Sequence, residues 1–513
     1  MMSDDGSVSH IPPFPDGYRG AGILLHVTSL PGPYGIGDFG PEAIRWIDLL
    51  HEKGQSWWQV LPLGPTGRGG SPYLPLSSFA INEILVSPDW LIEDGWISPS
   101  DVETHIPEGK VDFENVTTFK YDLLEKAWAS FQQATAEQQA SFQEFCDHHA
   151  HWLEDYALFR ALKVKFDDAD FLTWPHDLVN RDRSAIDEAH EELATSVRKF
   201  RFYQFLMAGH AGRVRDHARA KHVRIVGDVP IYVSAESSEA WANPSLFMLD
   251  EDKRPKFVAG VPPDYFSSLG QLWGNPVYNW EAHRRNGFRW FIDRLQSLLE
   301  YADAIRLDHF RGFAAAWNVP AEATTAVDGA WVPGPGAELF EAIQAELGSL
   351  PYIVEDLGTI TKDVYELRDQ FDLPGTLVLQ FAFDGDPNNF YLPENYKHNA
   401  VVYTGTHDNA TTRQWYDELP ESAREVVWRM LNIEPVTPDD VAWQLIRTAW
   451  SSDAALAIAP LQDVLNLGSE ARMNVPGEAD GNWDWRCPSE LLESDYFTRL
   501  KEVTEQTDRV EKL

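Results

Sequence analysis

The chain has 513 residues, 43% of them hydrophobic, with 80 acidic against 42 basic side chains and a formal net charge of −38. This composition describes a large acidic globular protein, and its charge argues against nucleic acid and anionic membranes as partners, because both bind positively charged surfaces. Two distant cysteines, an acidic N-terminus and the lack of an apolar run of about 18 residues predict a cytoplasmic protein.

The strong acidity has two interpretations that the sequence leaves open. Net repulsion between molecules gives ordinary solubility. Alternatively, the charge is an adaptation to a salt-rich cytoplasm, where screening over about 3 Å at 1 M salt removes the repulsion within the surface.

Eight short runs rich in β-branched, aliphatic and aromatic residues recur along the chain, as buried parallel strands do. In chain order they cover residues 22–27, 56–61, 223–227, 303–307, 352–354, 376–382, 400–403 and 455–460. Helical patterns fill gaps between them at residues 41–53, 288–301, 338–347 and 363–371. Eight such units predict an α/β fold, a (β/α)8 TIM barrel with inserted, mostly helical subdomains.

The spacing of these runs is uneven. We predict one catalytic barrel domain over residues 1–513, with a helical subdomain inserted at residues 71–221 between the second and third strands. Residues 232–286, dense in Pro, Gly and aromatic side chains, lie between the third and fourth strands. Loops that follow barrel strands face the catalytic end, so we expect this second insert to cover the substrate.

Polar side chains follow five of the predicted strands, where a barrel would bring them to one mouth. They are Asp228, then Arg306 and Asp308, then Glu355 and Asp356, then His407 and Asp408, and finally Gln462 and Asp463. An aspartate after a strand is often a helix cap or turn residue, and we prefer that interpretation for Asp356 and Asp463.

The remaining carboxylates suit cleavage of a glycosidic bond with retention, which needs a nucleophile and an acid about 5 to 5.5 Å apart. We expect Asp308 to stay ionised beside Arg306, as a nucleophile must. Glu355, among acidic neighbours, would keep its proton near neutral pH and act as general acid. Asp408 could stabilise the transition state and His407 could donate a further hydrogen bond.

Aromatic side chains provide a second indication, because sugar rings present apolar faces that stack on flat groups. Among the 20 tryptophans, Trp57 and Trp58 on a strand are expected in the core. Tyr73, Tyr265, Phe266 and Trp273 lie in Pro- and Gly-rich segments and are the candidates for stacking on a sugar.

Two alternative sites have weaker support. A metal-dependent barrel hydrolase would use ligand types present in Asp308-His309 and His407-Asp408, but the sequence has no H-E-x-x-H motif, and we expect His309 to be structural. The glycine-rich residues 64–70 lack the G-K-[ST] ending of a phosphate-binding loop.

The motifs GQLWGNP, RLDHFRG, VEDLG and THDN occur together and in this order. With GILLHVTSLPGPYGIGDFG, SPYLPLSSFAIN, GDVPIYV, LQDVLNLGSEARMNVPG and GNWDWR, they make the chain similar to the amylomaltase, or disproportionating enzyme, family of 4-α-glucanotransferases nearly end to end. The resemblance implies an α-amylase-type barrel without metal or diffusible cofactor. It also implies an α-1,4-glucan donor and a glucose or maltooligosaccharide acceptor.

The resemblance also implies roles for individual residues. Asp308 would be the nucleophile, Glu355 the acid/base and Asp408 the transition-state stabiliser. The residues expected to contact these groups or to line the glucan groove are Arg306, His407, Asp228, Gln271, Trp273, Tyr73, Asp384 and Asn474.

Departures from the family pattern include Glu236 and Glu239, where aspartates are common, and the alanine-rich residues 314–316. None involves the three carboxylates, so they bear on acceptor range and chain-length preference. Two other functions remain open. An α-1,4-glucan hydrolase would use the same carboxylates, whereas a glucan-binding protein without activity would keep the tryptophans and lose a carboxylate.

Overall fold

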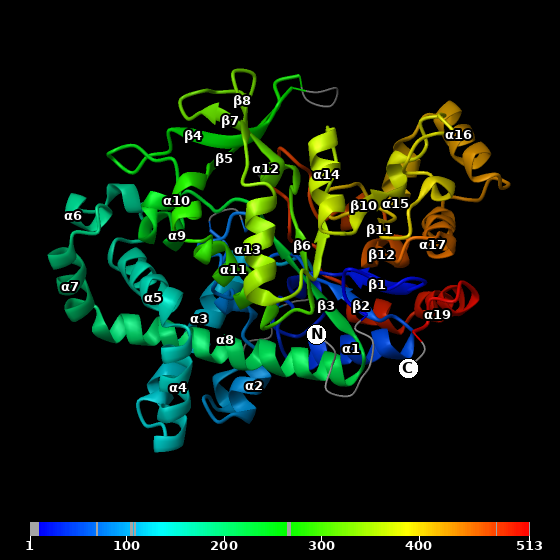
Figure 1. Cartoon of the computed structure of the whole chain (residues 1–513). Helices are drawn as coiled ribbons and strands as arrows, with labels where there is room; N and C mark the ends of the chain where they lie inside the picture. Colours follow the sequence, from blue (N-terminus) through cyan, green and yellow to red (C-terminus); the bar gives the residue numbers. More distant parts are fainter. Residues whose placement is uncertain are drawn as a thin grey trace.

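The computed structural model describes residues 10–67, 70–102, 106, 109–263, 268–478 and 480–511, and its centre is a closed barrel of eight parallel strands (Figure 1). Around the barrel the order is β1-β12-β11-β10-β9-β6-β3-β2. The strands are β1 (Gly20–Leu24), β2 (Trp57–Gln59), β3 (Arg224–Val229), β6 (Ala304–Leu307), β9 (Tyr352–Val354), β10 (Gly375–Val378), β11 (Ala400–Tyr403) and β12 (Leu456–Pro460). The predicted barrel and its eight strands are confirmed, but the bounds differ, and Leu379–Phe381 form a 3-10 helix where the sixth strand was predicted to continue.

These strands are buried along almost their whole length. Parallel barrel strands pack on helices outside and on layered side chains inside, so their sequences are apolar runs without alternation. Trp57 and Trp58 have no exposed surface, which confirms that they belong to the core.

Helices alternate with the barrel strands along the chain. They are α1 (Pro41–Glu52), α11 (Arg289–Leu299), α13 (Ala337–Leu347), α14 (Lys362–Gln370), α15 (Thr412–Glu418), α16 (Glu421–Leu431), α17 (Val441–Ser451), α18 (Leu461–Val464) and α19 (Tyr496–Gln506). The four predicted helices are confirmed as α1, α11, α13 and α14. In α1, Pro41 starts the helix and Trp46, Ile47 and Leu50 form its buried face.

A mostly helical region lies between β2 and β3, drawn in blue to green at the lower left of Figure 1. It contains α2 (Pro88–Glu93), α3 (Phe113–Phe131), α4 (Ala136–His148), α5 (Ala150–Lys165), α6 (His176–Val179), α7 (Arg183–Glu192) and α8 (Ala194–Ala220). Aromatic side chains fill its centre, with the rings of Phe131 and Phe202 stacked at 4.3 Å between centroids. These side chains belong to the same hydrophobic cluster as barrel residues such as Val226, so the two parts share one core.

A second, antiparallel sheet of four strands lies at one end of the barrel, at the top of Figure 1, in the order β5-β4-β7-β8. Its strands β4 (Phe257–Val261) and β5 (Gln271–Pro276) come from the segment after β3, which also holds α9 (Ser238–Ala242) and α10 (Trp280–Arg285). Strands β7 (Ala315–Pro320) and β8 (Ala330–Pro333) follow α12 (Arg311–Ala314), directly after β6. The sheet therefore joins two segments that follow neighbouring barrel strands.

Within the described residues, no helix is long and apolar enough to cross a lipid bilayer. Cys146 and Cys487 are free and buried, as the sequence predicts from their separation.

Candidate functional site

Arg306 joins two of the predicted carboxylates at the barrel mouth. The register between β3 and β6 places Asp228 opposite Arg306. The Arg306 Nη1 atom lies 2.7 Å from Oδ2 of Asp228 and 2.9 Å from Oδ1 of Asp308. Arg306 and Asp228 are buried, whereas 25% of the Asp308 side chain is exposed. Asp308 is thus paired with a fixed positive charge and still accessible from the mouth.

Glu355 lies next to this pair because β9 pairs with β6 in parallel, with Leu307 opposite Val354. The backbone N–H of His309 donates to Oε2 of Glu355 over 2.6 Å. Burial, followed by the nearby Asp308 charge, raises the pKa of Glu355 to about 8, although Arg306 and the His309 N–H act to lower it. Glu355 is therefore mainly protonated at neutral pH.

His309 adopts an uncommon backbone conformation between these two carboxylates, with φ of 48°. This left-handed geometry is rare for a residue with a side chain and occurs at constrained functional sites. Here it directs the His309 N–H at Glu355. Burial lowers the pKa of the His309 imidazole to about 4, so the ring is neutral.

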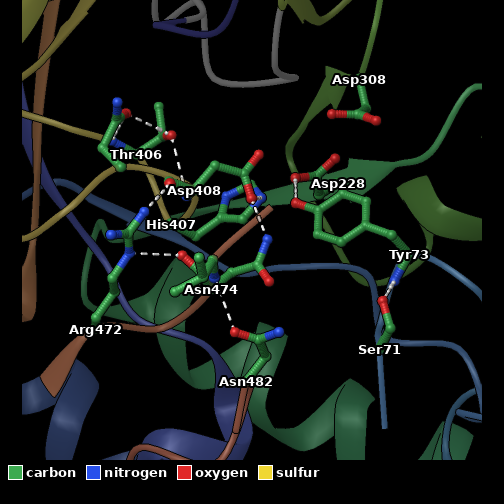
Figure 2. Close-up of polar contacts among 12 residues, drawn as sticks. Ser71, Tyr73, Asp228, Asp308, Thr406, His407, Asp408, Arg472, Asn474 and Asn482 are labelled. Carbon is green, nitrogen blue, oxygen red and sulfur yellow. Dashed lines mark hydrogen bonds and ion pairs between the residues drawn. The ribbon is translucent and has the colours of Figure 1, made fainter. Parts of the chain in front are cut away.

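Tyr73 connects the Arg306 side of the mouth with the side that follows β11. Its hydroxyl donates to Oδ2 of Asp228 over 2.9 Å, and its ring stacks on His407 with centroids 5.0 Å apart and planes 14° apart. Figure 2 shows the tyrosine between Asp228 and the His407–Asp408 pair. Burial and the Asp228 charge raise the pKa of Tyr73 well above its usual value, so the hydroxyl stays a donor.

Asp408 follows β11 and is held from a loop more than sixty residues further along the chain. Asn474 Nδ2 donates to Oδ1 of Asp408 over 2.6 Å, and Arg472 donates to the Asp408 backbone oxygen over 3.2 Å (Figure 2). The His407 Nε2 atom lies 3.3 Å from the same Oδ1. Burial lowers the pKa of His407, which favours a neutral ring. The Asp408 side chain is 47% exposed, so its carboxylate faces the open mouth.

Gln271 and Trp273 extend from the four-stranded sheet on β5. The indole N–H of Trp273 donates to Oε1 of Gln271 over 3.1 Å. The indole also meets the His309 ring edge-on, with centroids 4.7 Å apart. Through this contact the four-stranded sheet packs against His309, the residue whose N–H donates to Glu355. The other two stacking candidates, Tyr265 and Phe266, lie outside the described residues.

Asp384 is not joined to the other predicted site residues by a hydrogen bond or ion pair among the described residues. It is exposed in the segment after β10, where its Oδ1 accepts the N–H of Asp386 over 2.9 Å. Among the described residues it has no hydrogen bond or ion pair with the three predicted catalytic carboxylates.

Asp356 and Asp463 were expected to be helix caps or turn residues, but the structure gives each of them contacts with distant segments instead. Asp356 accepts from Arg368 over 2.7 Å and from the N–H of Thr376 over 2.8 Å. Asp463 accepts from Thr404 and twice from Thr412, including the first N–H of α15. Both carboxylates are buried and fully engaged in holding neighbouring segments.

Two further side chains belong to this site but were not among the predicted residues. Arg472 donates to the backbone oxygens of Asp408 and Asn474. Trp483 packs its ring 5.7 Å from Tyr73 and 6.0 Å from His407. Both residues lie in stretches that carry the family resemblance, Trp483 in GNWDWR and Arg472 in LQDVLNLGSEARMNVPG, but nothing in either stretch singled out these two side chains.

The comparisons with known proteins agree with this geometry. The glycoside hydrolase 77 family model, described as 4-alpha-glucanotransferase, matches residues 25–492. The chain belongs to this family. A 4-alpha-glucanotransferase of Synechocystis sp. is 47% identical over 495 residues, covering 95% of this chain and 97% of the relative. That of Thermus thermophilus is 46% identical over 498 residues, covering 96% and 99%.

Solved structures give the same family and fold. An amylomaltase from Streptococcus agalactiae in complex with acarbose superposes with a TM-score of 0.92 at 36% identity, covering 96% of this chain and 99% of that one. An amylomaltase from Corynebacterium glutamicum, at 18% identity and a TM-score of 0.76, shares the fold. The protein is therefore a 4-alpha-glucanotransferase of the TIM-barrel type, an enzyme of carbohydrate metabolism.

Proposed function

We propose that this enzyme transfers a segment of an α-1,4-glucan to the 4-hydroxyl of glucose or another glucan by a retaining double displacement. The observation that carries the proposal is the contrast between Asp308 and Glu355 on neighbouring strands. Arg306 contacts Asp308 at 2.9 Å, whereas Glu355 has a pKa raised to about 8 by burial and by the Asp308 charge. One carboxyl group is thus suited to attack and the other to donate a proton.

In the first displacement, an Asp308 oxygen attacks the anomeric carbon of the donor sugar. The bond from that carbon to the glycosidic oxygen breaks, and the departing oxygen takes the Glu355 proton. The products are a β-linked glycosyl-enzyme ester on Asp308, an ionised Glu355 and a shortened glucan. The Glu355 negative charge then faces the N–H of His309, which lies 2.6 Å from its Oε2.

In the second displacement, Glu355 takes the proton of the acceptor 4-hydroxyl, and the acceptor oxygen attacks the anomeric carbon. The ester bond to Asp308 breaks, so both carboxyl groups return to their starting states. Two inversions at one carbon restore the α configuration of the donor linkage.

The remaining site residues bind the sugar in this proposal. Asp408, oriented by Asn474 and flanked by His407, would accept hydrogen bonds from sugar hydroxyls and stabilise the positive charge that develops on the ring. Asp228 and Tyr73 would hold Arg306 and the adjacent wall of the groove. Asp384 would contact a more distant sugar.

Preference for an acceptor sugar over water is assigned to the segment that carries Gln271 and Trp273. An indole at 4.7 Å from His309 lies close enough to the carboxylates to cover a glycosyl-enzyme and to stack on an acceptor. We include a cytoplasmic location in the proposal, supported by the two free, buried cysteines.

The proposal is tested by incubating the protein with pure maltotriose at low and high KCl and separating the products by chain length. Glucose together with a ladder of longer oligosaccharides is the expected result. Only shorter products would indicate an α-1,4-glucan hydrolase, and an unchanged product pattern with Asp308→Asn would contradict the assigned nucleophile.

A further inference from the structure

A second group of ligand-type side chains lies at the opposite end of the barrel from the predicted catalytic carboxylates. His148 ends α4 and His149 links α4 to α5, while Glu300 caps the C-terminal end of α11. One ligand atom from each of these side chains falls within 4.8 Å of the others. Glu300 precedes β6 and Asp308 follows it, so the length of the strand separates this group from the reaction site.

The distances within the group suit a shared ion better than direct hydrogen bonds. His148 Nε2 lies 3.6 Å from Oε1 of Glu300, and His149 Nε2 lies 3.7 Å from Oε2. An N–H···O hydrogen bond spans about 2.7 to 3.2 Å. Two ligands of a tetrahedral ion bound at about 2.0 to 2.1 Å are about 3.4 Å apart. A small movement of the exposed His148 would therefore bring one ligand atom from each of the three side chains around a single ion.

In the His149 ring, the Nε2 atom is the one that faces a polar group, the Glu300 carboxylate. The imidazole is buried, and its Nδ1 atom has no hydrogen-bond partner in the described structure. Neutral imidazole and carboxylate are both good ligands for divalent transition metals.

Among the described residues, the Glu300 carboxylate has ion pairs with His148 and His149, whereas Arg215 contacts the Glu300 backbone. Arg215 donates to the backbone oxygen of Glu300 over 2.5 Å, and its other nitrogens hold Asp216 at 2.6 and 2.9 Å. His151 packs edge-on against Phe79, with centroids 6.1 Å apart. The Glu300 side chain is 31% exposed, which leaves room for a water molecule as a further ligand.

We propose that His148, His149 and Glu300 form a binding site for a divalent transition metal of the zinc class, with water as the fourth ligand. The ion fastens the junction of α4 and α5 to the end of α11, and so ties the helical region to the barrel. Its role is structural, because the site lies at the end of β6 remote from Asp308.

The test uses the full-length protein, stripped with a chelator and titrated with Zn²⁺ by calorimetry and by thermal unfolding. We expect one tight equivalent of Zn²⁺ and a rise in Tm of about 2 °C or more. Transfer activity on maltotriose stays the same with and without the metal. Absence of a tight equivalent or of a Zn²⁺-dependent rise in Tm would overturn the proposal.

Two variants locate the bound ion. His148→Ala removes a side chain that is 70% exposed, so the fold tolerates it, and Glu300→Gln keeps the shape of the carboxylate. Each should weaken Zn²⁺ binding at least about tenfold. His176→Ala removes an exposed histidine of the same helical region and should leave binding unchanged.

The acidic surface supplies the competing explanation, binding of cations to scattered carboxylates. Mg²⁺, which prefers oxygen ligands, therefore serves as the control ion. A rise in Tm with Zn²⁺ alone supports the site. An equal rise with Mg²⁺, or a Zn²⁺ effect that survives in both variants, would overturn it.

Discussion

The two sides of the barrel mouth hold their carboxylates in different ways. On one side, Asp228 and Asp308 contact the buried Arg306 guanidinium, and Glu355 lies against them. On the other, Asp408 is 47% exposed and is oriented by the neutral amide of Asn474. Burial raises the pKa of Glu355 and of Asp228 on the first side, whereas exposure leaves Asp408 on the second side free to contact sugar hydroxyls.

The largest expected effect comes from Asp308→Asn, which keeps the shape of the crowded side and removes the attacking oxygen charge. Transfer from maltotriose should fall by about 10⁴-fold or more, as for the loss of an enzymatic nucleophile. Initial rates of glucose release measure it, and Asp187→Asn on the surface of α7 is the matched control. A fall of less than about tenfold would place the nucleophile elsewhere.

Glu355→Gln should change the pH dependence of stability on this same side. Burial raises the pKa of Glu355 to about 8 and that of Asp228 to about 7, both above their ordinary values. The folded state therefore holds these protons more tightly than the unfolded chain does. The free energy of unfolding falls as the pH rises from the ordinary carboxyl pKa values to the raised values in the folded state. Glu355→Gln removes one of the two contributions.

Thermal unfolding of the two proteins at about pH 5, 7 and 9 tests this expectation. The Tm of Glu355→Gln relative to that of the native protein should rise as the pH increases. Parallel curves would mean that the Glu355 carboxyl does not carry a raised pKa. The native transfer rate should also decline above about pH 8, where Glu355 loses the proton that the first step requires.

On the exposed side, Asn474→Ala removes one hydrogen bond to a carboxylate and should have a smaller effect. Loss of a charged hydrogen bond of about 1.5 kcal/mol corresponds to about a tenfold fall in kcat. KM should change little, because Asp408 is proposed to act in the transition state. Steady-state kinetics separate the two quantities, and a change confined to KM would assign Asn474 to ground-state binding.

The smallest expected effect is that of Trp273→Ala, which leaves every carboxylate in place. Loss of the indole exposes His309 and the neighbouring carboxylates to solvent, so water should compete better with acceptor sugars. The ratio of transfer to hydrolysis should fall several-fold while total bond cleavage changes little. If the ratio is unchanged, the exclusion of water depends on residues other than Trp273.

The barrel could be predicted from the sequence because its strands are buried on both faces and read as apolar runs. Strands β7 and β8 were missed, because all four residues of β8 are exposed and β7 begins in the alanine-rich stretch. The link between Arg306 and Asp308 could be predicted because they are two positions apart in the chain, whereas the pairing of Arg306 with Asp228 depends on the register of β3 and β6.

Contacts between distant loops were harder to predict. Asn474 was identified by resemblance alone, and its bond to Asp408 arises from a loop that no pattern of spacing relates to β11. The histidines at 148, 149 and 151 lie close together in the sequence but were not predicted to form a metal site. Their carboxylate partner, Glu300, is brought to them by the packing of the helical region on the barrel.

The division of roles between Asp308 and Glu355 is tested most directly by trapping the intermediate. A maltooligosaccharyl fluoride needs no acid for departure of fluoride, so Glu355→Gln should complete the first displacement and then stall without its base. Mass spectrometry of proteolytic fragments should find the glycosyl group on Asp308. A glycosyl group on another side chain, or no adduct while fluoride is released in a burst, would contradict the account.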